Sequence, residues 1–276
     1  MDHSGLFWGW FFGWCPDFGW EKTSPSPLSV KILKILLRVS TGTRMEAANL
    51  LYTRDSYLKE FDATVTRTGP KFVVLDHTAF YPEGGGQPSD TGKLIVNGEE
   101  VKVIKVMKRG EEVFHYLDKD IELGASVHGV IDWEQRFNYM RLHSGEHLLT
   151  GLFETLDSGP KVFSSFSQLD FQPSEITEDT VKAVWKRFDE IIDENVPVEI
   201  YWTNRDELNV GDDKRKQSFL EKIPKNVHEL RMVKIGDYAE TFCMGTHVKS
   251  TGDIGKLKEL RMEPKKKRKK VVYFEI

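Results

Sequence analysis

The stretch EFDATVTRTGPKFVVLDHTAF (60–80), followed by TGKLIVNGEEVKVIKVMKRG (91–110) and EEVFHYLD (111–118), decides the fold of the first half of the chain. Apolar and polar residues alternate along these segments, which is the period of a half-buried β-strand. The pairs Gly69-Pro70 and Asn97-Gly98 lie between them and are strong turn signals. Several short strands at this spacing predict a small β-barrel over residues 45–132.

The remaining residues, 133–276, combine helical and strand patterns. Residues 133–156 have the helical period, with an apolar stripe formed by Leu142, Leu148, Leu149, Leu152, Phe153 and Leu156. Residues 177–194 predict a second helix, which we expect to begin after an N-cap at Thr177 and to be ended by Pro197. The later segments VEIYW, LRMVKIGDYAETFC and GKLKELRMEPKKKRKKVVYFEI are typical of strands around loops. We therefore expect an α+β domain packed on the barrel.

Residues 1–44 differ from both halves. The segment GLFWGWFFGWCPDFGW (5–20) is rich in tryptophan, but it lacks the basic start and the cleavage site of a signal peptide. The basic, apolar segment SVKILKILLRVS (29–40) would suit a membrane surface as an amphipathic helix. The interpretation that we favour is upstream sequence read in frame, so that residues 1–44 are an irregular extension and natural translation begins at Met45.

Composition limits the kind of protein. The 276 residues are 39% hydrophobic and 30% charged, as in soluble globular proteins. No apolar run approaches the ~20 residues of a membrane span, so we expect no membrane partner. Two cysteines are too few for a disulfide framework and favour a reducing compartment, which predicts a cytoplasmic protein. No heptad repeat argues for a dimer, so we expect a monomer.

The charge of −4 is unevenly distributed. Residues 261–276 have a net charge of +5, which leaves −9 for residues 1–260. An acidic protein can still bind RNA locally through such a basic segment. The candidate residues for contacting RNA phosphates are Lys265, Lys266, Lys267, Arg268, Lys269 and Lys270. The alternative is a charged hairpin loop that faces solvent.

Two pairs of residues have the spacing of metal ligands. His143 and His147 are four residues apart on a predicted helix, so both imidazoles project from one face. Cys243 and His247 are likewise four residues apart, and Cys243 is the only cysteine beyond the N-terminal extension. Three imidazole nitrogens and one thiolate sulfur suit tetrahedral zinc and disfavour calcium or magnesium. The sequence predicts one Zn²⁺ per chain.

A second motif overlaps the first. The run from His143 to His147 also matches H-x-x-E-H, the inverzincin protease signature, with Glu146 as general base. That interpretation gives no role to Cys243 and His247. Outside a protease, Glu146 is a partner of a metal-bound histidine, a general base, or a solvated helix carboxylate.

The glycine-rich segment YPEGGGQPSDTG (81–92) is a candidate for substrate binding. Gly84, Gly85 and Gly86 permit positive φ and close backbone approach, so their amides are candidates for contacting a substrate. Gln87 and Asp90 are candidates for bonding a substrate hydroxyl or amino group. The alternative is a tight turn between strands, with Asp90 bonding its own backbone.

Three segments together resemble a known family. MRLHSGEHLL (140–149) and RMVKIGDYAETFCMGTHV (231–248) resemble the second additional domain of alanyl- and threonyl-tRNA synthetases, and the glycine-rich segment resembles the motif of the barrel in alanyl-tRNA editing proteins. The resemblance covers about residues 49–276 and lacks an aminoacylation domain. The chain therefore resembles the free-standing AlaX family, and in particular its medium-length type.

This resemblance implies a zinc-binding editing domain at residues 133–276 that hydrolyses Ser-tRNA(Ala), and also Gly-tRNA(Ala), so the expected partner is mischarged tRNA(Ala). It implies that His143, His147, Cys243 and His247 are the zinc ligands. Two positions depart from the family pattern. Ser144 replaces a threonine but keeps the hydroxyl, and Met244 replaces a glycine, which puts the amino-acid specificity in doubt.

Ester hydrolysis needs an attacking water and stabilisation of a developing oxyanion, and zinc can assist either step. Catalytic candidates are Glu146 and Thr246. Selection of serine over alanine requires a partner for the serine hydroxyl, for which Thr246, Ser144 and Gln87 are candidates. Four protein ligands usually mark a structural metal, so a non-catalytic tRNA-binding module remains the alternative.

Overall fold

The computed structural model describes residues 49–154, 161–162, 168–171, 176–208, 210–211, 217, 220–221, 223–265 and 270–276. The predictions for residues 1–44, Met45 and Leu156 lie outside this part, as do those for Lys266, Lys267, Arg268 and Lys269. Residues 42–276 form one compact unit, so the domain boundary at residue 132 stays a prediction. Among the described residues, none of the helices has both the length and the hydropathy needed to cross a bilayer.

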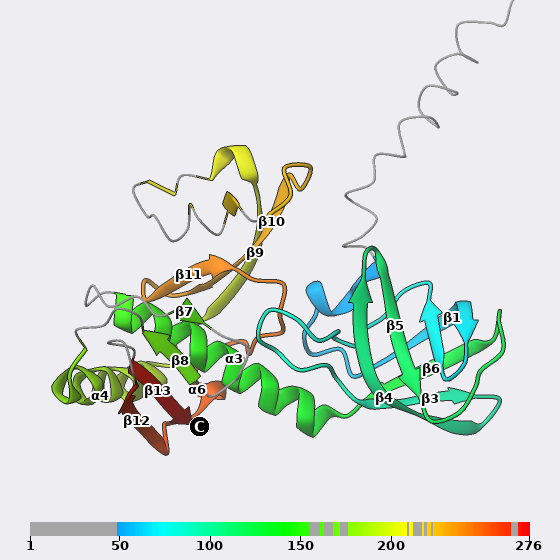
Figure 1. Cartoon of the computed structure of the whole chain (residues 1–276), viewed down its shortest axis with the longest axis horizontal. Coiled ribbons are helices and arrows are strands. Elements are labelled where there is room, and N and C mark those ends of the chain that lie inside the picture. Colours follow the sequence, from blue (N-terminus) through cyan, green and yellow to red (C-terminus); the bar gives the residue numbers. More distant parts are fainter. Residues whose placement is uncertain are drawn as a thin grey trace, which may run out of the picture. The chain divides into compact units, whose positions relative to one another are not determined.

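The first half of this unit is a closed barrel of six antiparallel strands in the order β1-β2-β5-β4-β3-β6 (Figure 1). The short 3-10 helix η1 (Leu51–Thr53) precedes it. The strands are β1 (Glu60–Gly69), β2 (Phe72–Leu75), β3 (Gly92–Val96), β4 (Glu99–Arg109), β5 (Glu112–Leu117) and β6 (Ser126–Ile131). The predicted barrel is confirmed. The sixth strand, which closes it, was not singled out in the sequence.

The alternating pattern explains the barrel interior. In β1 the buried side chains are Phe61, Ala63 and Val65, and the residues between them are exposed. Asn97 and Gly98 join β3 to β4 with φ angles of 51° and 84°. Two positive φ angles are typical of the two-residue turn whose twist matches paired strands. Local turn chemistry and side-chain alternation therefore agree on the same register.

The second half contains helices and two open sheets, which confirms the α+β class. The helices are α3 (Trp133–Glu154), α4 (Glu178–Glu194) and α6 (Thr251–Ile254), with the 3-10 helix η2 (Arg205–Glu207). A three-stranded sheet has the order β11-β10-β9, formed by β9 (Val198–Asn204), β10 (Glu229–Ile235) and β11 (Ala239–Phe242). A four-stranded sheet has the order β12-β13-β8-β7, formed by β7 (Lys161–Val162), β8 (Gln168–Phe171), β12 (Glu259–Pro264) and β13 (Lys270–Glu275).

Helix α4 begins and ends where the sequence predicts. Thr177 and Thr180 form a capping box, in which each side chain accepts from the other residue's backbone amide. The helix ends at Asn195, which adopts the left-handed conformation with φ 52°. The predicted end at residue 194 is confirmed. Asparagine tolerates positive φ and closes the helix, and Pro197 follows two residues after this cap.

Helix α3 is central to the second half. Leu148, Leu149 and Phe153 are buried in a core cluster that includes Phe188 of α4 and Val233 of β10. The barrel has a separate cluster, which includes Phe61, Val65, Leu94 and Val106. The helix that carries two predicted zinc ligands is thus fixed by its own core, which limits its movement.

Candidate metal centre

The four predicted zinc ligands lie together. Candidate ligand atoms of His143, His147, Cys243 and His247 are all within 4.8 Å of one another. The two histidines of α3 are buried, Cys243 is half-buried after the end of β11, and His247 is buried in the loop that follows. Residues separated by about a hundred positions in the chain thus converge on one point.

The distances fit the metal that the donor set suggests. The Cys243 Sγ atom is 3.5 Å from His143 Nε2 and 3.3 Å from His247 Nε2. With Zn–S and Zn–N bonds of about 2.3 and 2.0 Å, tetrahedral ligands of this kind are separated by about 3.5 Å. The residues present therefore fit a zinc ion held by three nitrogens and one sulfur.

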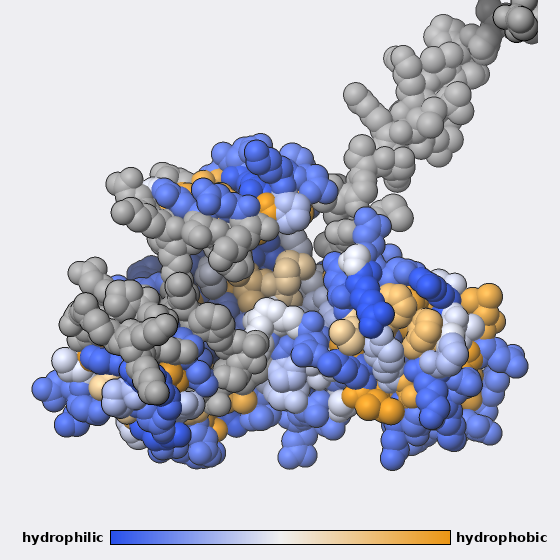
Figure 2. All heavy atoms as spheres, viewed as in Figure 1, coloured by the Kyte–Doolittle hydropathy of each residue, from blue (hydrophilic) through white to orange (hydrophobic). Residues whose placement is uncertain are grey.

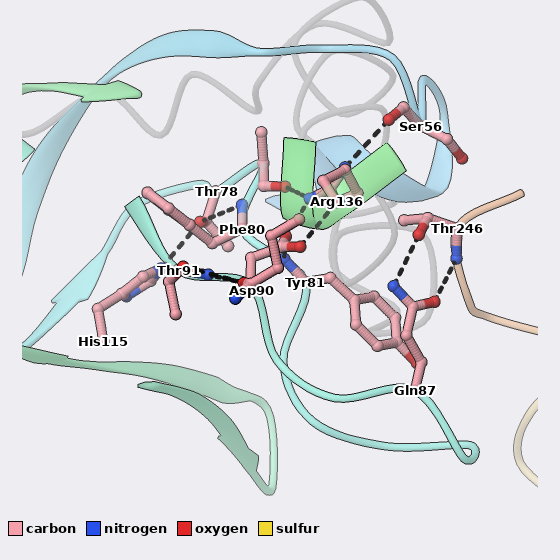
Figure 3. Close-up of polar contacts among 12 residues, drawn as sticks. Ser56, Thr78, Phe80, Tyr81, Gln87, Asp90, Thr91, His115, Arg136 and Thr246 are labelled. Atoms are coloured by element: carbon pink, nitrogen blue, oxygen red, sulfur yellow. Dashed lines mark hydrogen bonds and ion pairs between the residues drawn. The ribbon is translucent and has the colours of Figure 1, made fainter. Parts of the chain in front are cut away.

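His143 is oriented by the glycine-rich loop of the barrel. Its Nδ1 lies 3.1 Å from Gln87 Oε1, so a neutral imidazole donates there, and Nε2 is then the ring atom that would bind a metal. The Gln87 amide also donates to Thr246 Oγ1 at 2.7 Å, and its Oε1 accepts from the Thr246 backbone at 3.0 Å (Figure 3). One side chain thus connects a helical ligand to the loop between Cys243 and His247.

His247 is oriented by helix α3. Its Nδ1 lies 3.0 Å from Ser144 Oγ, and this oxygen also accepts from the Val248 amide at 3.2 Å. The His247 Nε2 atom consequently faces Cys243, as His143 Nε2 does. Both of these bonds join Ser144 to the segment that carries His247, so we propose that Ser144 positions this ligand in place of the predicted contact with substrate.

Arg231 of β10 supports the loop that carries Cys243 and His247. Its Nη1 donates to the carbonyls of Cys243 at 2.6 Å and Gly245 at 2.9 Å, and its Nε donates to Thr53 O at 3.0 Å. The side chain is buried, and its burial lowers the pKa of the guanidinium. Burial raises the pKa of the Cys243 thiol, and the positive charge of Arg231 opposes that rise, which favours the thiolate that a metal requires.

The loop approaches His143 so closely that residue 245 must be glycine. A Cβ atom at Gly245 would lie 2.1 Å from His143 Cε1 and 2.5 Å from its Nδ1. Such distances do not occur between non-bonded atoms, so an alanine here would displace the ring or the loop. Gly245 thus brings Cys243 into contact with the helical pair.

Burial keeps the cluster in the state that metals bind. Desolvation lowers the pKa of His143 to about 3 and lowers that of His247 well below its ordinary value, so both rings are neutral. Burial raises the pKa of the Cys243 thiol to about 11, opposed by the Gly245 amide and Arg231. Metal binding must therefore displace a proton from Cys243.

The glycine-rich loop contains a tight turn. Gly84 and Gln87 exchange backbone hydrogen bonds of 3.1 and 2.9 Å, and the φ angles of Gly85 and Gly86 are 55° and 83°. The amide of Gly84 is thus used within the turn. The prediction that all three glycine amides meet substrate is reduced to Gly85 and Gly86 at its tip.

Asp90 is occupied inside the protein. Its carboxylate forms a buried ion pair with Arg136 of α3, whose Nε donates to Asp90 Oδ1 at 2.8 Å (Figure 3). It also accepts from the Tyr81 amide, and Arg136 donates to the carbonyls of Ser56 and Ala79. We therefore propose that Asp90 fixes the glycine-rich loop against α3, in place of the predicted contact with substrate.

Two other groups of predicted residues have mixed outcomes. Glu146 is only 8% exposed and accepts from Thr150 at 3.4 Å, so the solvated-carboxylate alternative is wrong. Lys265 forms an ion pair with Glu263, and Lys270 donates to the carbonyl of Ile176. Contact of these lysines with tRNA stays a prediction.

Sequence reasoning missed Arg231 and Arg136. Both lie in segments already singled out as strand or helix, but their partners are carbonyls and a carboxylate far away in the chain. An arginine inside an otherwise apolar strand, as in LRMV (230–233), was the available signal. It indicates a buried cation without naming its partner.

Two known families match parts of the chain. Residues 43–135 match the class II (A) tRNA synthetases, and residues 230–273 match the second additional domain of threonyl and alanyl tRNA synthetases. The second match contains Cys243 and His247, together with Arg231. The first contains the barrel and the glycine-rich loop.

Individual proteins match over longer stretches. The alanyl-tRNA editing proteins AlaX-M of Methanosarcina barkeri and Methanosarcina acetivorans are 35% and 34% identical, over 81% and 82% of this chain and 97% of their own lengths. The alanine–tRNA ligase of Thermococcus kodakarensis is 38% identical over 77% of this chain. The chain spans only 24% of the length of that ligase, but nearly the whole of the editing proteins.

Proposed function

This chain belongs to the AlaX family of alanyl-tRNA editing proteins, and on that premise we propose that it is a hydrolase that removes a wrongly attached amino acid from tRNA(Ala). We propose that one zinc ion, held by His143, His147, Cys243 and His247, takes part. The observation that carries the proposal is the convergence of these four donors within 4.8 Å, beside a loop that is joined to them through Gln87.

Zinc would supply a Lewis acid for the ester carbonyl or for a water molecule. The protein residues do the rest. Gln87 and Ser144 hold the imidazoles of His143 and His247 in the tautomer that binds metal. Arg231 adds a fixed positive charge close to Cys243, which favours the negative charge that develops on an ester oxygen.

Glu146 is the proposed general base. It lies on α3 three residues after His143 and one residue before His147, and it is buried. A carboxylate in that position can accept a proton from an attacking water. The conservative change Glu146→Gln should lower kcat and leave the zinc content unchanged.

Selection of serine is proposed to depend on Thr246. Its hydroxyl accepts from Gln87, which leaves the hydroxyl proton available to a substrate oxygen. A site with such a donor disfavours alanine, because the donor then stays unpaired. Thr246→Val should keep zinc and weaken the preference for seryl over alanyl ester. An unchanged preference would remove this role.

Contacts with the tRNA backbone are also part of the proposal. The amides of Gly85 and Gly86 lie at the tip of a turn, and open space surrounds the Cα of Gly86, so a phosphate can approach it. The basic run from Lys265 to Lys270 would neutralise further phosphates, so binding should weaken as salt increases.

A second candidate function has one observation in its favour. Four protein ligands complete a tetrahedral site, which is usual for structural zinc, so a non-catalytic tRNA-binding module is the alternative. The protease alternative is disfavoured, because Cys243 and His247 join the two helical histidines, and among the described residues no carboxylate belongs to this cluster.

The deciding experiment measures ester hydrolysis. The full chain is incubated with Ser-tRNA(Ala), Gly-tRNA(Ala) and Ala-tRNA(Ala), with His143→Ala as the control variant. Release of serine or glycine but not alanine, lost in the variant, supports the proposal. Tight tRNA binding without release of any amino acid would favour the binding module.

A further inference from the structure

Strand β9 exposes an unusual set of side chains. Ile200, Tyr201 and Trp202 are between 37% and 39% exposed. In the described part of the chain six large hydrophobic side chains are exposed, and four of them belong to this sheet or to its ligand loop, since Met244 adjoins Cys243. Edge strands usually carry charges that discourage association. An edge strand with two exposed aromatic rings near a metal cluster therefore needs a partner.

The register of the sheet places Trp202 on the side of the metal cluster. Trp202 pairs with Arg231, and the Cys243 amide donates to the Arg231 carbonyl at 3.1 Å, which continues the register of β10 and β11. The three residues form one row across the sheet and share one face. Neighbouring strands are about 4.8 Å apart, so the Cα atoms of Trp202 and Cys243 are separated by about 10 Å.

Tyr201 is the natural comparison, because successive side chains of a strand point to opposite faces. It pairs with Met232, and its hydroxyl donates to Glu240 at 2.6 Å. The ring of Trp202 makes no aromatic or cation–π contact among the described residues. In the view of Figure 2 the surface below β9 and β10 is hollowed, and weakly hydrophobic atoms are visible inside the hollow.

The following inference rests on the proposed function. We propose that the terminal adenine of the aminoacyl-tRNA stacks on Trp202 while the ester lies at the metal centre. The ester is carried by the ribose of that same nucleoside, so the base must lie close beside the cluster. The 3′ end of tRNA is single-stranded, and unpaired bases stack readily on exposed aromatic rings. Arg231 lies between Trp202 and Cys243 in this row, and its buried guanidinium donates to the carbonyls of Cys243 and Gly245 in the ligand loop.

The test is a cycle of one protein change and one substrate change. The substrates are two RNA minihelices with a seryl ester, prepared chemically, one ending in adenosine and one in an abasic ribose. Trp202→Ala should raise KM for the adenosine substrate about tenfold, with kcat nearly unchanged, and should not alter KM for the abasic substrate. Trp202→Phe should retain most of the affinity.

Tyr201→Ala is the matched control, because it removes an equally exposed aromatic ring from the other face of the same strand. It should behave as the unchanged protein, with equal zinc content and equal circular dichroism in all variants. If Trp202→Ala and Tyr201→Ala give the same KM, or if the abasic substrate is weakened equally, the proposal is overturned.

Binding without chemistry separates this inference from the proposed function. The uncharged adenosine minihelix should quench tryptophan fluorescence of the full chain, and the quenching should be lost in Trp202→Phe. Quenching without serine release would contradict the hydrolase but support stacking on Trp202. Serine release without that quenching would contradict the stacking alone. If light scattering shows a dimer that Trp202→Ala converts to a monomer, β9 joins two copies of the chain and the stacking proposal is wrong.

Discussion

The candidate metal centre has a helical half, His143 and His147 on α3, and a loop half, Cys243 and His247 after β11. Each half supplies two candidate ligands four residues apart. The helical half is positioned by regular backbone hydrogen bonds and by a buried core beneath α3. The loop half is positioned by side chains from elsewhere, above all Arg231 of β10, Gln87 of the barrel and Ser144 of α3.

The two halves of the candidate metal centre therefore hold each other in position through hydrogen bonds. The non-ligating nitrogen of the helical ligand His143 contacts Gln87, which also holds the loop half. The non-ligating nitrogen of the loop ligand His247 contacts Ser144, which lies on the helix. The following changes weaken one half at a time, beginning with the largest expected effect.

The largest effect should follow removal of the guanidinium beneath the loop half. Arg231→Met removes the side-chain donor of the carbonyls of Cys243 and Gly245, and it also removes the bond to the Thr53 carbonyl. Each buried carbonyl that loses its partner costs about 1–3 kcal/mol, so the free energy of unfolding should fall by roughly 3 kcal/mol or more. Zinc affinity should fall as well, which competition with a chelator measures.

Arg205→Met is its control, because Arg205 also donates to loop carbonyls, those of Leu220, Ile223, Pro224 and Val227, but not to the ligand loop. It should lose stability and keep zinc affinity. Equal zinc affinity in both variants would mean that the loop half does not depend on Arg231.

The same difference explains how much the sequence predicts. The barrel, α3 and the four ligands follow from local periods and from spacings of four residues, which an unaligned sequence displays. The hydrogen bonds that hold the two halves together cannot be predicted in this way, because Gln87 and Thr246 are 159 positions apart and Arg231 contacts Thr53 across 178 positions. Asp90 is an example. Its carboxylate beside a glycine-rich loop suggested a contact with substrate, but its observed partner is Arg136, which is 46 residues away in the sequence.

A pH titration tests whether acid lowers the stability of the barrel, which supplies Gln87 to the loop half, independently of the metal cluster. His115 is fully buried in the barrel, 2.8 Å from Thr78 Oγ1, and burial lowers its pKa from 6.5 to about 4. As the pH falls, His115 is protonated in the unfolded chain at a higher pH than in the folded protein. The stability from neutral His115 is therefore complete above pH 6.5 and is lost as the pH falls towards 4, by roughly 3 kcal/mol in total.

Denaturant unfolding of the metal-free protein between pH 7 and 4 measures this loss. The control is His115→Gln, which should show a smaller loss, because it removes one buried titrating group and leaves His143 and His247 in place. Parallel curves for the two proteins would assign the acid sensitivity to the metal cluster instead of the barrel.

Alanine substitutions at two glycines, one in the loop half and one on helix α3, test how closely each half is packed. Gly245→Ala places a Cβ atom 2.1 Å from the His143 ring, which cannot move without leaving the metal, so zinc affinity should fall on the order of 100-fold. Gly145→Ala on α3 meets the flexible end of Ile276 at 2.3 Å, which can rotate away, so it should lower stability and spare zinc. Comparable zinc loss in both variants would contradict a specific contact between loop and ring.

The smallest effects are expected from variants that remove the hydrogen-bond partner of one histidine and leave all four candidate ligands in place. These variants distinguish the two halves most directly. Gln87→Leu deletes the acceptor of His143 Nδ1, and Ser144→Ala deletes the acceptor of His247 Nδ1. Such partners of metal-bound histidines typically contribute 10- to 100-fold to affinity, so each variant should lose about tenfold or somewhat more. Gln87→Leu should lose more than Ser144→Ala, because Gln87 also bonds Thr246 twice and so holds both halves. Zinc dissociation constants measured by chelator competition decide the order, and an equal or reversed order would mean that the barrel loop is not the joint between the halves.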